Sequence, residues 1–184
     1  MSNPWRTLSQ KVVYATRFGF RLREDSVIDP SGQLSTYTVL EGGDFVTIVG
    51  ITKTREIIFV HQWRYPLERM LLELPAGHLE VEDPLTAAKR EFSEEVGGHS
   101  AHWSLIVALW ACVGATKTRN YIFLATDVDL DHEPHLDANE SLEVRLIPYH
   151  QAMTFAASGK FEDEKTVAAL FLADHYLRTH ANDS

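Results

Sequence analysis

The chain has 184 residues, and its 45% hydrophobic and 10% aromatic content is enough to bury one substantial core. Its formal net charge of −9 argues against broad binding to nucleic acid or to anionic membranes, because their phosphate groups would repel it. The longest apolar stretch, residues 105–115, is too short to cross a bilayer, and residues 1–10 lack the apolar core of a signal peptide. The single cysteine, Cys112, has no partner for an internal disulfide, so we expect a small buried hydrophobic residue in a cytoplasmic protein.

The local composition predicts an alternation of strands and turns over the first part of the chain. We expect strands near residues 11–21, 35–41, 44–51, 56–61 and 71–75, with turns at 29–32, 42–43 and 52–54. A helix follows, then strands at 103–110, 121–125 and 143–147, and helices at 149–158 and 164–179. Because strands and helices mix without strict alternation, we predict an α+β fold with a mixed sheet and helices on its faces.

The helix after residue 83 has clear start and stop signals. Asp83 is a preferred N-cap residue, and Pro84 suits the first helical position, where its missing N–H is no loss. Gly97 can supply the left-handed conformation on which helices commonly end. We therefore predict a helix over residues 84–96.

This helix carries three carboxylates, Glu91, Glu94 and Glu95, at positions i, i+3 and i+4, which share one face. Like charges at this spacing repel each other, and a hard cation such as Mg2+ or Mn2+ would neutralise them. Taken alone, the segment would more often be an ordinary solvated helix face. The upstream context, an apolar strand that ends in Pro75-Ala76-Gly77 and a loop with Glu82, favours the metal site.

With that context, residues 77–98 resemble the Nudix signature, G-x5-E-x7-R-E-U-x-E-E-x-G-U, in which U is apolar. The residues that match are Gly77, Glu82, Arg90, Glu91, Phe92, Glu94, Glu95 and Gly97. Two positions depart from the pattern: the loop between Gly77 and Glu82 is one residue short, and Gly98 replaces the last apolar residue. Counting five residues from Gly77 would place Asp83 at the glutamate position, but Glu82 keeps the helix spacing and leaves Asp83 free to cap.

The resemblance extends to residues 59–66 and 72–77, which are similar to the "Q-x-R-x-P" and "l-E-l-P-A-G" segments of the ADP-ribose pyrophosphatase branch. It implies an α/β/α sandwich with an N-terminal antiparallel strand extension. We expect this extension over residues 1–42, with a role in forming a homodimer, and the Nudix domain over 43–184. Val113 and Thr118 stand where the branch usually has a proline and a glutamate, which leaves the substrate open.

The resemblance implies Mg2+-dependent or Mn2+-dependent hydrolysis of a nucleoside diphosphate linked to another group, first ADP-ribose, giving AMP and ribose 5-phosphate. The implied metal ligands are the Ala76 carbonyl, Glu91, Glu94 and Glu95, which also form the catalytic set together with Glu140 as general base and Glu143 as the fallback. The candidate substrate-binding residues are Arg64, Glu73, His78, Lys117 and Arg119. Gly77, Glu82, Arg90 and Gly97 are expected to be structural, with Arg90 pointing away from the three glutamates and holding the loop through Glu82 or a backbone carbonyl.

Several alternatives remain open at this point. The substrate could be another nucleotide sugar such as GDP-mannose, or the domain could be a catalytically idle ADP-ribose sensor. A Nudix isomerase is a weaker third possibility. Arg64 could simply pair with Glu68 or Glu73, and His78 could be a loop histidine without a role.

Overall fold

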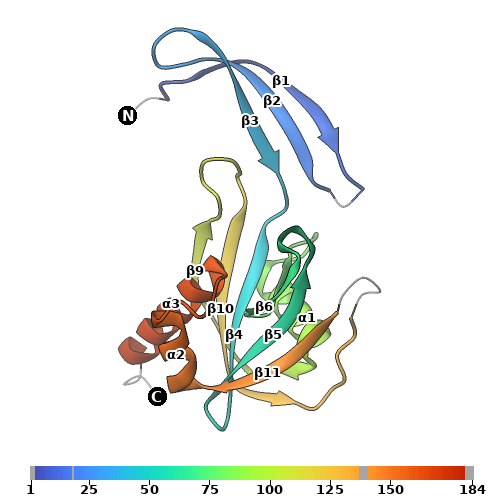
Figure 1. Cartoon of the computed structure of the whole chain (residues 1–184), viewed down its shortest axis with the longest axis vertical. Helices are drawn as coiled ribbons and strands as arrows, with labels where there is room; N and C mark the ends of the chain where they lie inside the picture. Colours follow the sequence, from blue (N-terminus) through green and yellow to red (C-terminus); the bar gives the residue numbers. More distant parts are fainter. Residues whose placement is uncertain (1–2, 18, 137–140, 181–184) are drawn as a thin grey trace. The chain divides into compact units, whose positions relative to one another are not determined.

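The computed structural model describes residues 3–17, 19–136 and 141–180 (Figure 1). The chain divides into two compact units, one of residues 1–44 with 110–120 and one of residues 45–109 with 121–184. The sequence predicts a boundary after residue 42 and assigns residues 110–120 to the second part, whereas in the structure these residues belong to the first unit. Among the helices of the described residues, none is long and apolar enough to cross a membrane.

The first unit is built on a three-stranded antiparallel sheet of β1 (Arg6–Ala15), β2 (Arg21–Ile28) and β3 (Leu34–Glu41), in that order. The predicted turn at residues 29–32 is confirmed, with Gly32 at φ 86°. The single strand predicted over 11–21 is wrong, because the chain reverses between Thr16 and Phe20, where the Thr16 N–H donates to the Phe20 carbonyl at 2.8 Å. Gly19 permits this reversal because it adopts the left-handed conformation, with φ 85°. The β-branched and aromatic residues around it favour a strand, so the sequence pattern does not indicate the turn.

Residues 110–120 form the tip between β9 (His102–Trp110) and β10 (Arg119–Leu130), and this tip contacts β3. The Leu40 N–H donates to the Ala115 carbonyl at 2.8 Å, and the Tyr37 hydroxyl donates to the Gly114 carbonyl at 3.0 Å. Cys112 lies in this tip and is exposed, so the expectation of a buried thiol is wrong. Its apolar neighbours in the sequence belong to a turn, not to the interior of a strand.

The second unit contains an eight-stranded sheet with the path β11-β5-β4-β10-β8. Its remaining strands are β4 (Phe45–Thr52), β5 (Glu56–Arg64), β6 (Arg69–Glu73), β7 (Ala76–His78), β8 (Gly98–His99) and β11 (Leu142–Pro148). A 3-10 turn, η1 (Tyr65–Leu67), connects β5 to β6, and these two strands pair with each other. In addition, β7 pairs with β4, and β9 pairs with β10. The two shortest strands, β7 and β8, were not predicted, since two or three residues are too few to show a periodic pattern.

Alternate residues of the central strands pack on opposite faces of the sheet. On β5, Ile57 and Phe59 belong to the core that includes α2 (Tyr149–Ala157) and α3 (Glu164–His180). The neighbouring Ile58 and Val60 belong to the core beneath α1 (Pro84–Val96), which lies apart from the other two helices (Figure 1). This arrangement confirms an α+β fold with a mixed sheet between helical layers.

Helix α1 begins and ends where the sequence predicted. The Asp83 carboxylate accepts hydrogen bonds from the backbone N–H groups of Leu85 at 3.0 Å and Thr86 at 3.2 Å. At the other end Gly97 has φ 65° and its N–H donates to the Ser93 carbonyl at 3.0 Å. Both ends are therefore satisfied locally, which fixes the register of the carboxylates on this helix.

Candidate active site

The three carboxylates of α1 lie in different environments although they share one face. Glu95 is only 5% exposed, and its Oε2 accepts a hydrogen bond from the Ala76 N–H at 3.0 Å. The side chain of Glu91 is 15% exposed and that of Glu94 is 45% exposed. The cluster therefore extends from the edge of the core, at Glu95, toward solvent, at Glu94.

Strand β7 approaches α1 so closely that only glycine fits at residue 77. A Cβ placed on Gly77 would lie 1.8 Å from Cδ of Glu91, far inside van der Waals contact. The strand is held from its other side, because Gly77 pairs with Val46 and Ala76 pairs with Thr47 on β4. The main chain at residues 76–77 and the helix carboxylates are thus adjacent, and only a residue without a Cβ permits this approach.

Arg90 links the loop before α1 to two of the three glutamates. Its Nε and Nη2 donate to Oε1 of Glu82 at 3.0 and 2.8 Å, and Nη2 also donates to the His78 carbonyl at 3.1 Å. These contacts agree with the expected structural role. The expectation that Arg90 points away from the glutamates is wrong, since Nη1 donates to Glu91 and Glu94, each at 2.9 Å. Glu94 lies one helical turn after Arg90 on the same face of the helix, where charged pairs meet. The long Arg90 side chain also reaches the adjacent Glu91.

This guanidinium partly neutralises the cluster. Burial opposes the charge on Arg90, but the hydrogen bond to Glu82 and the charge of Glu91 outweigh that effect and raise its pKa above the usual value. In the described residues, the carboxylate oxygens of Glu91, Glu94 and Glu95 do not all come within 4.8 Å of one another. Arg90 holds two of the carboxylates, and the Ala76 amide holds the third.

The residues present fit a hard divalent cation. They offer carboxylate oxygens beside a main-chain segment that approaches without a side chain, and oxygen donors are what Mg2+ and Mn2+ select. Glu91, Glu94 and Glu95 would hold such an ion after release from their present partners. The part assigned to the Ala76 carbonyl stays a prediction.

A second charged group, Arg64 on β5 with Glu73 on β6, lies in the same unit. Arg64 donates from Nε and Nη2 to the two oxygens of Glu73 at 2.7 and 2.8 Å, so the alternative pairing with Glu73 is observed. Lys165 on α3 donates to Glu73 as well, and also to Asp163 at 2.8 Å. The sequence indicated neither Lys165 nor Asp163, because nothing in its pattern connects the start of α3 to β6.

This group surrounds an open cavity of about 280 Å3 that is also lined by Pro66, Leu67 and Leu71. Glu73 itself is 1% exposed. Burial disfavours its charged form, but the Arg64 hydrogen bond and the charge of Lys165 overcome this effect and hold the pKa of Glu73 below its usual 4.5. Glu73 is therefore ionised at neutral pH and balances two cations.

The other candidates fall in several places. Glu140 lies outside the described residues, and Glu143, the fallback, is exposed on β11 and paired with Arg145. Exposed Lys117 and half-buried Arg119 belong to the first unit, where Arg119 stacks 4.2 Å from the Trp110 ring centroid and donates its N–H to Asp44 at 2.8 Å. Their roles, and that of exposed His78 at the end of β7, stay predictions.

The charge balance at Glu73 predicts a pH-dependent contribution to stability. A carboxyl whose pKa is lowered by folding stabilises the protein above its unfolded pKa of 4.5 and loses that contribution as the pH falls through the folded pKa. Glu73→Gln should lower the free energy of unfolding at pH 7 by about 2 kcal/mol, less than the ~3–5 kcal/mol of a fully buried pair because Arg64 retains contact with water. Urea denaturation at a series of pH values measures the difference.

The difference between wild type and Glu73→Gln should narrow as the pH falls below 4.5. The matched control is Glu162→Gln, because Glu162 pairs with Arg69 at an exposed position and its loss should cost less than ~1 kcal/mol. A wild-type advantage that grows toward acid pH would contradict the account.

Comparisons with known proteins agree with this geometry. Residues 44–170 match the family described as NUDIX domain, and residues 5–40 match the one described as nucleoside diphosphate sugar hydrolase N-terminal domain. An ADP-ribose pyrophosphatase of Mycobacterium tuberculosis is 30% identical, covering 95% of this chain and 85% of its own length. An ADP-ribose pyrophosphatase of Bacillus subtilis is 29% identical over 90% of both chains. GDP-mannose pyrophosphatase of Yersinia pestis is 27% identical, over 72% of this chain and 71% of its own.

A solved structure titled as an ADP compounds hydrolase superposes with a TM-score of 0.82 over 96% of this chain and 95% of its own, at 21% identity, which shows the common fold. Three features of the site lie inside the matched domain. They are the glutamates on α1, the glycine on β7 that their close approach requires, and the arginine that connects them to the preceding loop. The chain therefore belongs to the Nudix family of hydrolases.

Proposed function

We propose that this hydrolase cleaves the diphosphate bond of a nucleoside diphosphate linked to another group, with Mg2+ or Mn2+ as its cofactor and ADP-ribose as its leading substrate. The observation that carries the proposal is the set of helix carboxylates beside the side-chain-free backbone at Gly77. Water would add to one phosphorus while the bond from that phosphorus to the bridging oxygen breaks, giving AMP and ribose 5-phosphate.

The residues on α1 suit this chemistry. A bound divalent ion supplies a water of lowered pKa and stabilises the charge that develops on the phosphate oxygens. Glu91, Glu94 and Glu95 would hold it, while Arg90 keeps the loop residue Glu82 against the helix. Arg64 is the candidate phosphate-binding residue, because a guanidinium forms paired hydrogen bonds with phosphate as it does here with Glu73.

The names of the relatives support ADP-ribose first and GDP-mannose second. Two relatives called ADP-ribose pyrophosphatase match 90% or more of this chain, while the GDP-mannose pyrophosphatases match 72%. The residues in place of the branch's substrate markers, exposed Val113 and half-buried Thr118, leave room for a different preference. A catalytically idle sensor is the contrasting outcome of the experiment below.

The test is hydrolysis of ADP-ribose, GDP-mannose, UDP-glucose, diadenosine polyphosphates and NADH with Mg2+ or Mn2+. Glu95→Gln should lower kcat by about 100-fold or more, since it removes a group that holds the ion stabilising transition-state charge. The matched control is Glu162→Gln, which changes an exposed glutamate on an ordinary salt bridge and should retain wild-type turnover. Product analysis should give AMP and ribose 5-phosphate from ADP-ribose.

Turnover of GDP-mannose but not of ADP-ribose would support the proposed reaction and show that the proposed substrate is wrong. If no compound is hydrolysed while ADP-ribose still binds, the chain is a sensor and the proposed activity is wrong. Equal turnover by wild type and Glu95→Gln would remove the carboxylate cluster from the mechanism.

We also propose that the three-stranded sheet of the first unit joins two copies of the chain in a homodimer. Strand β1 is exposed at every position, and its apolar side chains include Leu8 at 50% and Tyr14 at 65% exposure. An apolar strand at the edge of a sheet is a surface that proteins normally cover. Residues 5–40 match a family of their own, described as nucleoside diphosphate sugar hydrolase N-terminal domain, which supports treating this extension as a distinct structural unit.

Light scattering should give the mass of a dimer for the wild type and a shift toward monomer for Val12→Asp, which places a charge on β1. The control is Val81→Asp, because Val81 is fully exposed in a loop of the second unit and should not affect assembly. A monomeric wild type would overturn the dimer.

We propose a cytoplasmic location as well, with nucleotide-linked small molecules as partners and neither nucleic acid nor membrane. A single, exposed thiol at Cys112 is compatible with a reducing compartment. The net charge of −9 supports the absence of polyanionic partners.

A further inference from the structure

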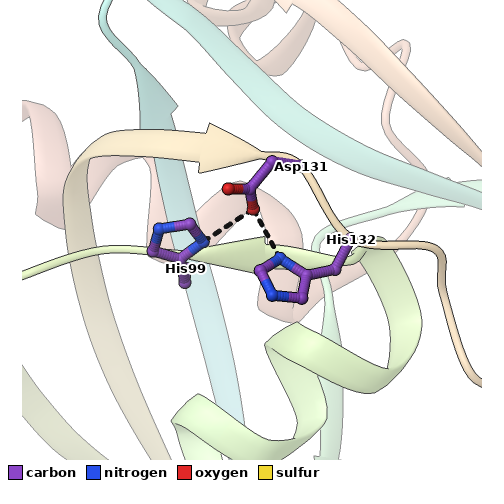
Figure 2. A group of neighbouring side chains, drawn as sticks. All are labelled: His99, Asp131 and His132. Carbon is purple, nitrogen blue, oxygen red and sulfur yellow. Dashed lines mark hydrogen bonds and ion pairs between the residues drawn. The ribbon is translucent and has the colours of Figure 1, made fainter.

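A compact group of two histidines and one aspartate lies just beyond the carboxyl end of α1, the helix that carries the three glutamates. His99 is the last residue of β8, while Asp131 and His132 directly follow β10. The antiparallel pairing of β8 with β10, with His99 opposite Asp129, brings the three residues together. Figure 2 shows both imidazole rings turned toward the Asp131 carboxylate.

The atoms that face one another in this group are possible metal ligands. Nδ1 of His99 lies 3.0 Å from Oδ1 of Asp131, and Nδ1 of His132 lies 2.5 Å from the same oxygen. Two tetrahedral ligands of one zinc ion, each ~2.1 Å from it, lie ~3.4 Å apart, so each ring would have to move away from the Asp131 oxygen by less than about 1 Å to admit the ion. The three possible ligand atoms all lie within 4.8 Å of one another. Among the residues that the structure describes, no other group of three histidine, cysteine or acidic side chains lies this close together.

The donor types select a different ion from the one expected on α1. Imidazole nitrogens with one carboxylate oxygen suit Zn2+ and its neighbours in the transition series, whereas Mg2+ favours oxygen ligands alone. The three side chains are 53% to 64% exposed, so a metal here would keep an open position for water.

The backbone around the group is held against the end of α1. The His132 N–H donates to the Gly97 carbonyl at 3.3 Å, and the His135 N–H donates to the Glu94 carbonyl at 2.8 Å. A Cβ on Gly97 would lie 1.9 Å from the His132 carbonyl oxygen, which shows how closely this segment contacts the helix terminus. The carboxyl end of a helix carries partial negative charge and so favours a nearby cation.

We propose that His99, Asp131 and His132 bind a transition-metal ion of the Zn2+ type at the carboxyl end of α1, separate from the site for the hard divalent cation. The bound ion would tie β8 to the segment after β10. That segment already hydrogen-bonds to the carbonyl of Glu94 and to the helix cap, so the ion would also restrain the helix that carries the active-site glutamates.

The test is titration of the full, untagged chain with Co2+ in the presence of excess Mg2+, followed by its visible absorption. We expect one equivalent of Co2+ to bind, to resist Mg2+ and to be displaced by Zn2+. His99→Gln and His132→Gln should each weaken Co2+ binding at least about tenfold, because loss of a direct ligand should cost no less than loss of an outer partner. His150→Gln is the matched control, since His150 is exposed on α2 and outside the group.

Circular dichroism establishes that each variant is folded, and the two histidine variants provide independent tests of the same site. The Glu91→Gln variant should retain this Co2+ signal, because Glu91 belongs to the other site. The proposal is overturned if excess Mg2+ abolishes Co2+ binding, if both histidine variants bind like the wild type, or if His150→Gln loses binding equally.

Discussion

The candidate active site depends on the contact between the β7 backbone at Gly77 and the carboxylate of Glu91 on α1. A side chain at residue 77 would overlap this carboxylate at 1.8 Å, so the absence of a Cβ sets the distance between strand and helix. The same approach lets the Ala76 N–H reach Glu95, the most buried of the three glutamates. Pairing of β7 with β4 and packing of α1 on the sheet hold both partners in place. A single backbone approach thus places main chain and acidic side chains together, as binding of a hard cation requires.

In the second unit, basic side chains compensate the negative charge of two groups of acidic residues. Arg90 bridges Glu82, Glu91 and Glu94, and it keeps acidic groups close together that would otherwise repel. Arg64 and Lys165 do the same for Glu73, which lies at 1% exposure where an unpaired carboxylate would be costly. At Glu73, Arg64 and Lys165 hold the pKa of the carboxyl below its usual value despite its burial. Under the proposed function, the α1 glutamates would exchange Arg90 for a metal ion, and Arg64 would exchange Glu73 for a phosphate.

The parts of the molecule that the sequence predicted well are those set by local signals. Asp83 and Gly97 delimit α1 because capping depends on a few neighbouring residues, and the glutamate spacing follows from the helix itself. The reversal at Gly19 and the exposure of Cys112 were missed, because β-branched and apolar composition continues through both turns. The bridge from Arg90 to Glu94 and the contact of Lys165 with Glu73 depend on long, flexible side chains or on tertiary packing, which sequence spacing does not determine.

The most direct test of the central claim is Mn2+ binding, measured by electron paramagnetic resonance, to wild type, Gly77→Ala and Gly114→Ala. The added methyl group of Gly77→Ala should displace Glu91 and weaken Mn2+ binding at least about tenfold while the protein remains folded. Gly114→Ala is the control, because a Cβ there meets nothing within 4 Å, and it should bind like the wild type. Unchanged Mn2+ affinity in a folded Gly77→Ala variant would contradict the account, since the approach of β7 to α1 would then not determine the metal site.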